Sequence, residues 1–285
     1  MVLNVINDFK KKRLLIIISL VIIALLLITN LIVERIKRRL YGVAEGVTYE
    51  GESVEYLFWN EVRNLVREDA EKRRVWSRSA DIDAKTGRII AEKEGKIIDI
   101  ESTVKRIMEA EAGTAVTAKV YQIDSYPTEE DLKKVTEVIG SYKTSISGSR
   151  SRLENIKLAA ESINNQLLYS DEVFSFNQVV GPRTEEQGYK EGPVLYNGTA
   201  GSGIGGGVCQ VSSTLYNAVQ EANLQIIERY PHSSPVRYVP EGQDAAVAWN
   251  LLDFKFHNQY LFPLIIKGSV HGRTLVIKIL GYQQE

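Results

Sequence analysis

The chain has 285 residues, with 35 Lys and Arg against 36 Asp and Glu, and 44% of its residues are hydrophobic. This balanced charge gives no reason to expect a nucleic-acid or polyanion partner, and the composition excludes a largely disordered chain. A single cysteine excludes an intramolecular disulfide.

Residues 14–33 form an apolar run whose only polar members are Ser19, Thr29 and Asn30. At about 1.5 Å per residue such a helix spans roughly 30 Å, the thickness of a membrane's hydrocarbon core. We therefore expect residues 1–40 to form a cytoplasmic tip and a single-pass transmembrane anchor. A cleaved signal peptide is the alternative, but the run is long for one and a basic segment, not a small-residue cleavage site, follows it. Basic residues flank both ends, so charge does not fix the orientation.

Residues 41–140 are expected to form a juxtamembrane segment followed by a small α+β domain. Asp99 precedes a short amphipathic helix and is its expected N-cap. Alternating polarity over residues 114–123 predicts a half-buried strand. Thr128 and Asp131 have the spacing of a capping box, which predicts a helix ending at Gly140.

Residues 141–285 are expected to form a second α+β domain with a mostly antiparallel sheet and a cysteine-bearing helix. The stretch 141–151 is rich in Ser and Gly, which predicts a linker or an exposed loop. An apolar stripe beginning at Leu153 predicts the helix that follows. Strands are expected at 225–229, 245–249 and 253–256, with a terminal hairpin pairing 264–270 with 274–280.

Cys209 follows three consecutive glycines and lies at the predicted start of a helix. Free N–H groups and the positive end of the helix dipole lower the pKa of a thiol there, and the thiolate is the nucleophilic form. The same N–H groups and those of Gly205, Gly206 and Gly207 could hold an oxyanion. A phosphate cradle is less favoured because no Lys-Ser/Thr pair follows the glycines. A buried, inert cysteine is the other alternative.

A nucleophilic thiol needs a base, and the chain offers three histidines. His232 lies in a proline-flanked turn after a predicted strand, whereas His257 is near a strand end and His271 at a hairpin tip. We therefore favour His232. Asp253 is the preferred orienting acid and Asp244 the alternative, although either could form an ordinary salt bridge.

Long motifs in the C-terminal half resemble those of the VanW family. They comprise residues 174–177, 180–184, 188–189 and 203–217, the later His232-Ser233-x-Pro235-Val236, and residues 253–256. The resemblance extends over residues 143–281. Residues 87–128 resemble more loosely the peptidoglycan-binding-like domain that often precedes VanW domains.

This resemblance implies a cell-envelope protein whose C-terminal domain lies outside the membrane and whose partners are peptidoglycan stem peptides. Some members are similar in activity to L,D-transpeptidases, which implies that Cys209 forms a thioester acyl-enzyme with His232 as base. Arg183 would hold a stem carboxylate or brace its own loop, and we assign Gly205–Gly207, Gln210 and Ser212 to substrate binding. No metal or other cofactor is expected. A non-catalytic peptidoglycan-binding protein and a thiol carboxypeptidase or endopeptidase are the alternatives.

Overall fold

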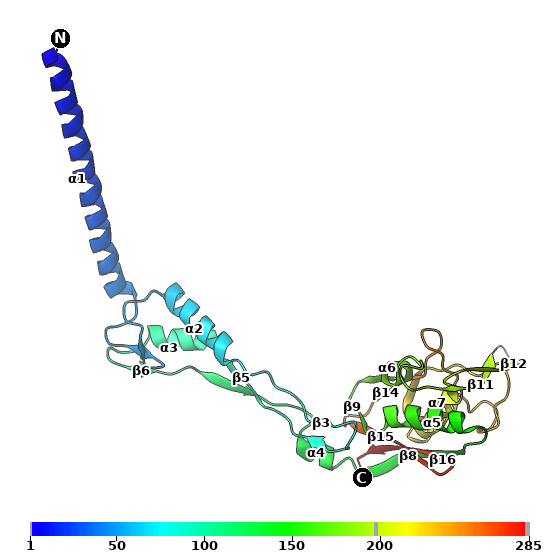
Figure 1. Cartoon of the computed structure of the whole chain (residues 1–285). Helices are drawn as coiled ribbons and strands as arrows, with labels where there is room; N and C mark the ends of the chain where they lie inside the picture. Colours follow the sequence, from blue (N-terminus) through cyan, green and yellow to red (C-terminus); the bar gives the residue numbers. More distant parts are fainter. Residues whose placement is uncertain (1, 197–198, 283–285) are drawn as a thin grey trace. The chain divides into compact units, whose positions relative to one another are not determined.

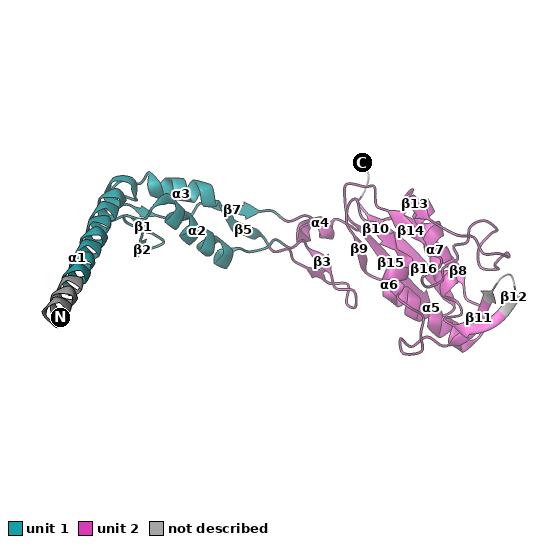
Figure 2. Ribbon diagram, turned by 90° about the horizontal axis from the view of Figure 1, so that it is seen from above, with its two compact units in different colours: residues 1–77, 94–124 teal, residues 78–93, 125–285 magenta. Residues whose placement is uncertain are grey.

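The computed structural model describes the backbone of residues 2–196 and 199–282, and the side chains of residues 14–194 and 201–282. The chain divides into two compact units, residues 1–77 with 94–124 and residues 78–93 with 125–285 (Figure 2). Each unit has its own hydrophobic cluster. The expected α+β class with an N-terminal apolar helix is confirmed.

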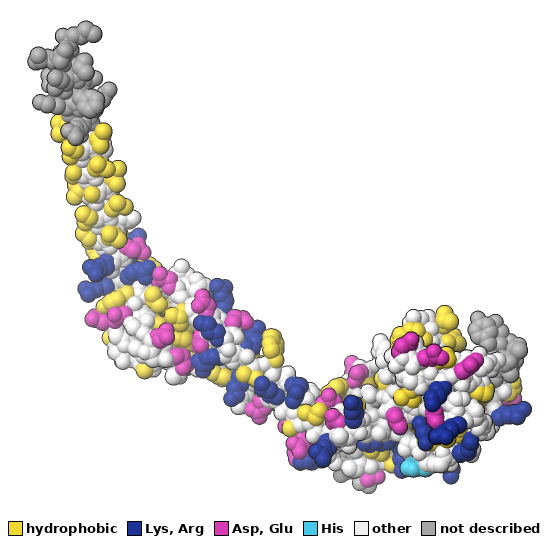
Figure 3. Space-filling view, in the orientation of Figure 1, with side chains coloured by type: hydrophobic (Ala, Val, Ile, Leu, Met, Phe, Trp, Pro, Cys, Tyr) yellow, Lys and Arg dark blue, Asp and Glu magenta, His cyan; other side chains and the backbone are white. Residues whose placement is uncertain are grey.

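The first unit begins with one long helix, α1 (Val2–Tyr41). Within it, Leu14–Tyr41 is long and apolar enough to cross a membrane, and its large apolar side chains are exposed (Figure 3). This helix is compatible with a membrane anchor or a signal peptide. The rest of the unit comprises β1 (Thr48–Tyr49), β2 (Glu52–Ser53), α2 (Trp59–Arg73), β5 (Gly95–Ile98), α3 (Ile100–Met108), β6 (Ala115–Val116) and β7 (Val120–Ile123).

The end of α1 is built into the fold of the first unit. Arg38 donates two hydrogen bonds to Glu61, at 2.7 and 2.9 Å, and a third to the carbonyl of Tyr56 at 3.2 Å. Glu61 also accepts the N–H of Phe58 at the start of α2, at 2.8 Å. Immediately after α1, Val43 is buried and its backbone exchanges hydrogen bonds with that of residues 56 and 57. Helix α1 and the unit that follows it are therefore one folded piece.

The second unit is organised around a four-stranded antiparallel sheet in the order β8-β16-β15-β9. Its strands are β8 (Glu137–Ser145), β9 (Gln166–Leu168), β15 (Leu264–His271) and β16 (Thr274–Gly281). Helices α5 (Arg150–Ile163) and α7 (Val208–Glu221) pack on this sheet and against each other (Figure 1). The predicted terminal hairpin is confirmed as β15 and β16.

A smaller antiparallel sheet, in the order β10-β14-β13, completes the core of the second unit. It comprises β10 (Val173–Ser175), β13 (Gln225–Glu228) and β14 (Lys255–His257), and Phe174 stacks on Phe256 across it at 4.9 Å between ring centroids. The remaining elements are β3 (Asp81–Ile82), β4 (Ile89–Ile90), α4 (Glu129–Lys133), α6 (Phe176–Val180), β11 (Glu191–Tyr196) and β12 (Thr199–Ile204). Strands β11 and β12 form a hairpin that leads directly into the glycine loop before α7.

The prediction of a linker at 141–151 is wrong for residues 141–145; only residues 146–149 form a loop, and α5 begins at Arg150. Residues 137–145 form β8, which pairs along its length with β16. Its small residues reflect close packing against α7: a Cβ on Gly140 would lie 2.2 Å from the carbonyl oxygen of Ala218. Thr144, also on β8, is buried and hydrogen-bonded to Thr214 at 2.9 Å.

Three other expectations changed in detail. The caps at Asp99 and Thr128 are confirmed, but α4 ends at Lys133, because the chain enters β8 four residues later. The strand expected at 114–123 is two short strands. The strand expected at 245–249 is an irregular segment with isolated β-bridges at Ala246 and Ala248. Its carbonyl groups accept hydrogen bonds from the side chains of Ser212 and Asn177, so the segment does not pair continuously with another strand.

Candidate active site

Cys209 is the second residue of α7, as the glycine-Cys-apolar pattern predicted. The N-cap, Gly207, has φ of +113°, a conformation that favours glycine, so the chain turns sharply into the helix. Among the described residues, the Cys209 amide donates no backbone hydrogen bond, whereas its neighbours Val208 and Gln210 donate to Gly205 and Gly207. The thiol is partly buried and lies 3.4 Å from the carbonyl oxygen of Val247. One free N–H therefore lies beside the sulfur.

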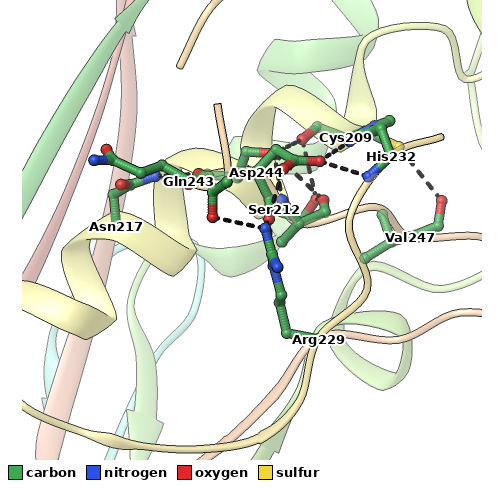
Figure 4. A network of polar contacts seen from close by, with 11 residues as sticks. Cys209, Ser212, Asn217, Arg229, His232, Gln243, Asp244 and Val247 are labelled. Carbon is green, nitrogen blue, oxygen red and sulfur yellow. Dashed lines mark hydrogen bonds and ion pairs between the residues drawn. The ribbon is translucent and has the colours of Figure 1, made fainter. Parts of the chain in front are cut away.

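The His232 imidazole lies between the thiol and a carboxylate. Its Nδ1 forms a hydrogen bond with Asp244 Oδ2 at 2.5 Å (Figure 4), and the ring lies near enough to the Cys209 thiol for each group to shift the pKa of the other. The same carboxylate oxygen accepts the backbone N–H of His232 at 2.6 Å. Because an ionised carboxylate only accepts hydrogen bonds, Nδ1 carries the proton and Nε2 is left for the thiol. The side chains of His232 and Asp244 are only 9% and 10% exposed, so water competes little with these contacts.

Helix α7 also holds the segment that carries Asp244. Ser212 and Ser213 both donate to the carbonyl of Ala245, at 2.7 and 3.3 Å, and Ser213 accepts its N–H at 2.9 Å. Asn217, one turn further on, donates to the carbonyl of Gln243 at 2.7 Å. The Ser-Ser motif after Cys209 therefore fixes the position of the acid.

The expected substrate-binding roles of Gln210 and Ser212 do not match their positions. Both residues are at most 1% exposed. Gln210 accepts a hydrogen bond from Arg152 at 2.7 Å and donates to Thr144 and to the carbonyl of Ser145. Their polar atoms serve internal contacts, because both side chains point from α7 into packed elements.

The site shifts the pKa values of its members in opposite directions. Burial alone would raise the pKa of the Cys209 thiol, but the hydrogen bond and positive charge of His232, with contributions from Val247 and Arg183, lower it overall. Burial alone would lower the pKa of His232, but contacts with Cys209 and Asp244 raise it overall. The Asp244 carboxyl has a lowered pKa because the hydrogen bonds and charge of His232 outweigh burial. These directions favour a thiolate, an imidazolium and a carboxylate.

Asp253 lies elsewhere and does not contact His232. Its carboxylate accepts hydrogen bonds from Ser175 Oγ at 2.6 Å, the Asn177 N–H at 2.9 Å and the Phe254 N–H at 2.8 Å. It therefore caps the start of α6. The acid beside the imidazole is Asp244, the alternative in the sequence.

Arg183 lies against the glycine loop, where a Cβ on Gly205 would approach its Cβ to 2.8 Å. Its Nη1 donates to Asn177 at 2.7 Å, and its buried Nη2 has no hydrogen-bond partner among the described residues. Burial lowers the pKa of the guanidinium, while the Cys209 charge acts in the opposite direction. Arg183 thus braces its loop through one nitrogen and carries an unused donor on the other.

The glycines of the loop allow backbones to approach closely. A Cβ on Gly206 would lie 2.5 Å from the carbonyl carbon of Gly192 in β11, and one on Gly207 would lie 3.0 Å from Arg152 and Ile156 on α5. Asn155 of α5 donates to the carbonyl of Gly206 at 3.0 Å. Gly205, Gly206 and Gly207 therefore lock the start of α7 against its neighbours.

Sequence reasoning missed several residues around the thiol. Arg152 lies over the ring of Tyr238, 6.0 Å from its centroid. Burial raises the pKa of Tyr238, and the nearby charge of Cys209 raises it further. Arg229 contacts Asp244. Their positions depend on loops far apart in the chain, which local patterns do not reveal. Within the described residues, no group of three or more His, Cys, Asp or Glu side chains could hold a metal ion.

The second unit is therefore an α+β domain of antiparallel sheets in which Cys209, at the N-terminus of α7, lies beside a His232–Asp244 pair. Residues 151–280 match the family described as VanW like protein, so this part of the chain is a VanW-like domain.

Two curated relatives support this assignment. The chain is similar to the uncharacterized protein YoaR of Bacillus subtilis, with 48% identity over 50% of this chain and 48% of YoaR. It is also similar to the vancomycin B-type resistance protein VanW of Enterococcus faecalis, with 34% identity over 36% of this chain and 40% of VanW. The chain thus spans about half the length of the curated relatives or less. No solved structure matches it.

Proposed function

We propose that this protein is a membrane-anchored, cysteine-dependent acyltransferase of the cell envelope that cross-links peptidoglycan stem peptides in the manner of an L,D-transpeptidase. The observation that carries the proposal is the arrangement of Cys209, His232 and Asp244: the thiol lies at the start of α7, its pKa is lowered by His232, and Asp244 binds the imidazole. A buried structural cysteine has no need of an imidazole oriented by a carboxylate, whereas a nucleophile does.

In the first half-reaction, the Cys209 sulfur attacks the carbonyl carbon that precedes the terminal D-residue of a donor stem. A C–S bond forms, and the free N–H of Cys209 stabilises the oxyanion of the tetrahedral intermediate. The C–N bond then breaks while His232 Nε2 gives its proton to the departing amine. The products are a thioester on Cys209 and a free D-amino acid.

In the second half-reaction, the side-chain amine of an acceptor stem attacks the thioester. His232 takes a proton from this amine as the new C–N bond forms, and the Cys209 thiolate departs. The result is an amide cross-link and the enzyme in its starting state. Asp244 keeps the imidazole oriented in both half-reactions. Arg183, with its unused Nη2 donor, is the candidate partner for a carboxylate of the stem.

The envelope location is part of the proposal. The name of the VanW relative links that protein to vancomycin resistance, and the family resemblance implies peptidoglycan as substrate. The bonds from Arg38 to Glu61 and Tyr56 support a retained anchor, because removal of α1 would break them. Residues after α1 would then lie outside the membrane, where peptidoglycan is found.

The full chain in detergent, incubated with disaccharide-tetrapeptide muropeptides and followed by mass spectrometry, tests the proposal. Wild type should form cross-linked dimers and release the terminal D-residue. Cys209→Ala should form none, and His232→Ala should lose on the order of a hundredfold or more. His271→Ala, at an exposed hairpin tip, is the matched control. Release of the D-residue without dimers would indicate a carboxypeptidase. Cleavage within the stem would indicate an endopeptidase, and binding of the muropeptide without any product would indicate a non-catalytic protein.

A further inference from the structure

Arg229 holds both the backbone and the carboxylate of Asp244. It lies one residue after β13, and its Nε donates to the Asp244 carbonyl oxygen at 2.6 Å. Its Nη2 donates to Asp244 Oδ1 at 3.0 Å and to the carbonyl of Gly242 at 2.8 Å. The guanidinium lies 5.1 Å from the ring centroid of Tyr216 on α7, and its side chain is 20% exposed. One side chain thus ties the acid segment together and to the helix of the nucleophile.

The two carboxylate oxygens of Asp244 have different partners. Oδ2 accepts both hydrogen bonds from His232, and Oδ1 accepts the one from Arg229. The terminal torsion of an aspartate is broad, so a carboxylate without a partner on Oδ1 rotates easily. The contact with Arg229 restricts this rotation and keeps Oδ2 directed at Nδ1 of the imidazole. Orientation of the imidazole in turn decides whether Nε2 faces the thiol.

We propose that Arg229 is a positioning residue of the thiol site: by fixing the Asp244 carboxylate, it keeps His232 oriented to activate Cys209. Among the described contacts its nitrogens bond to the acid segment and not to the sulfur, so it acts through Asp244. The proposal deepens the function proposed above and shares with it only the reactive thiol, not the peptidoglycan substrate.

The geometry requires an arginine. A guanidinium presents several N–H groups in a rigid fork, and here they reach two carbonyls and one carboxylate. A lysine carries the same charge on a single flexible ammonium, so it restores the charge near Asp244 but not the three-point contact. Arg229→Lys therefore separates geometry from charge.

The test measures how fast iodoacetamide alkylates Cys209 at neutral pH in the detergent-solubilised full chain. Arg229→Lys and Arg229→Gln should both be slower by about tenfold to a hundredfold, the scale expected for a misplaced catalytic group. NMR of the histidine side chains should show that the His232 Nδ1–H signal shifts or broadens in both variants. Arg150→Gln, which removes the same charge from a side chain that is 92% exposed, should match wild type.

Wild-type alkylation and an unchanged His232 signal in the Arg229 variants would overturn the proposal. Full recovery by Arg229→Lys would also overturn it, because charge alone would then be sufficient. Should Arg229→Gln unfold, Arg229→Lys decides the question, once thermal unfolding has shown that this variant is folded. The assay uses no muropeptide, so failure of wild type to cross-link would contradict the proposed function and leave this test intact.

Discussion

Two buried aspartates allow the candidate site to be tested separately from the stability of the domain. The side chains of Asp244 and Asp253 have nearly equal exposure, 10% and 11%, and each accepts three hydrogen bonds from the protein. Only Asp244 contacts the imidazole. We expect Asp244→Asn to slow alkylation of Cys209 strongly and Asp253→Asn to leave the alkylation rate near wild type.

Both substitutions should destabilise the protein by similar amounts. The asparagine amide keeps one acceptor oxygen and replaces the other with an NH₂ donor. Each variant therefore loses charge-assisted hydrogen bonds, and its new NH₂ group faces a donor of the protein. A hydrogen bond to a charged group contributes about 1.5–3 kcal/mol, which gives a loss of roughly 2–4 kcal/mol for either variant. This is less than the roughly 5–15 kcal/mol stability of an ordinary domain, so both variants should fold.

The effect of Asp244→Asn on stability should depend on pH. The pKa of Asp244 is lowered in the folded protein, chiefly because the bonds from His232 outweigh burial. A carboxyl with a lowered folded pKa contributes stability above its unfolded pKa of about 3.9 and loses it as pH falls through the folded value. The difference in unfolding free energy between wild type and Asp244→Asn should therefore be full from about pH 4 up to the pH at which His232 loses its proton, and shrink in more acidic solution.

Chemical denaturation and the rate of iodoacetamide alkylation, measured on the same preparations, give both quantities. Equal alkylation rates in the two variants would refute the reasoning, because the contact between Asp244 and His232 would then not affect the thiol. A strong reduction in Asp253→Asn alone would instead make Asp253 the orienting acid.

The alkylation rate of wild-type Cys209 should rise at a pH below the roughly 8.5 of a free cysteine; an inflection at or above that value would favour an inert thiol. Gly206→Ala places a Cβ against the backbone of β11 and should destabilise the domain by about 1–3 kcal/mol in thermal unfolding. Gly201→Ala, whose Cβ would meet only one methyl group at 3.9 Å, should not, and equal effects would argue against the close packing of the loop. The chain should remain in washed membranes with its N-terminus intact, and Arg38→Ala should increase proteolysis after α1 more than Arg35→Ala does. A mature protein that begins beyond α1 would contradict the retained anchor.

The sequence predicted the parts of the site that are local. Three glycines, a cysteine and an apolar stripe specify a helix start, and Cys209 lies there because these determinants are consecutive in the chain. The prolines near His232 similarly indicated a fixed turn. The terminal hairpin followed from two alternating runs separated by a short turn.

The remaining features depend on contacts between distant segments. Asp244 and Asp253 both adjoin predicted strands, and only the packing of residues 243–245 against α7 shows which one meets the imidazole. Strand β8 was missed because Gly140 was predicted to end a helix and the Ser- and Gly-rich residues after it to form a linker, whereas the small size of Gly140 serves the packing of α7. Arg229 carried no motif that distinguished it from a surface arginine.

The most direct test of the central claim is the intact mass of the full chain, quenched in acid shortly after mixing with a tetrapeptide stem. The account predicts an added mass equal to the stem without its terminal residue, located on Cys209 and removed by hydroxylamine as a thioester would be. Cys209→Ala should show no added mass. A wild-type protein that consumes the stem without this adduct, or an adduct that persists in Cys209→Ala, would contradict a mechanism based on the Cys209 thiol.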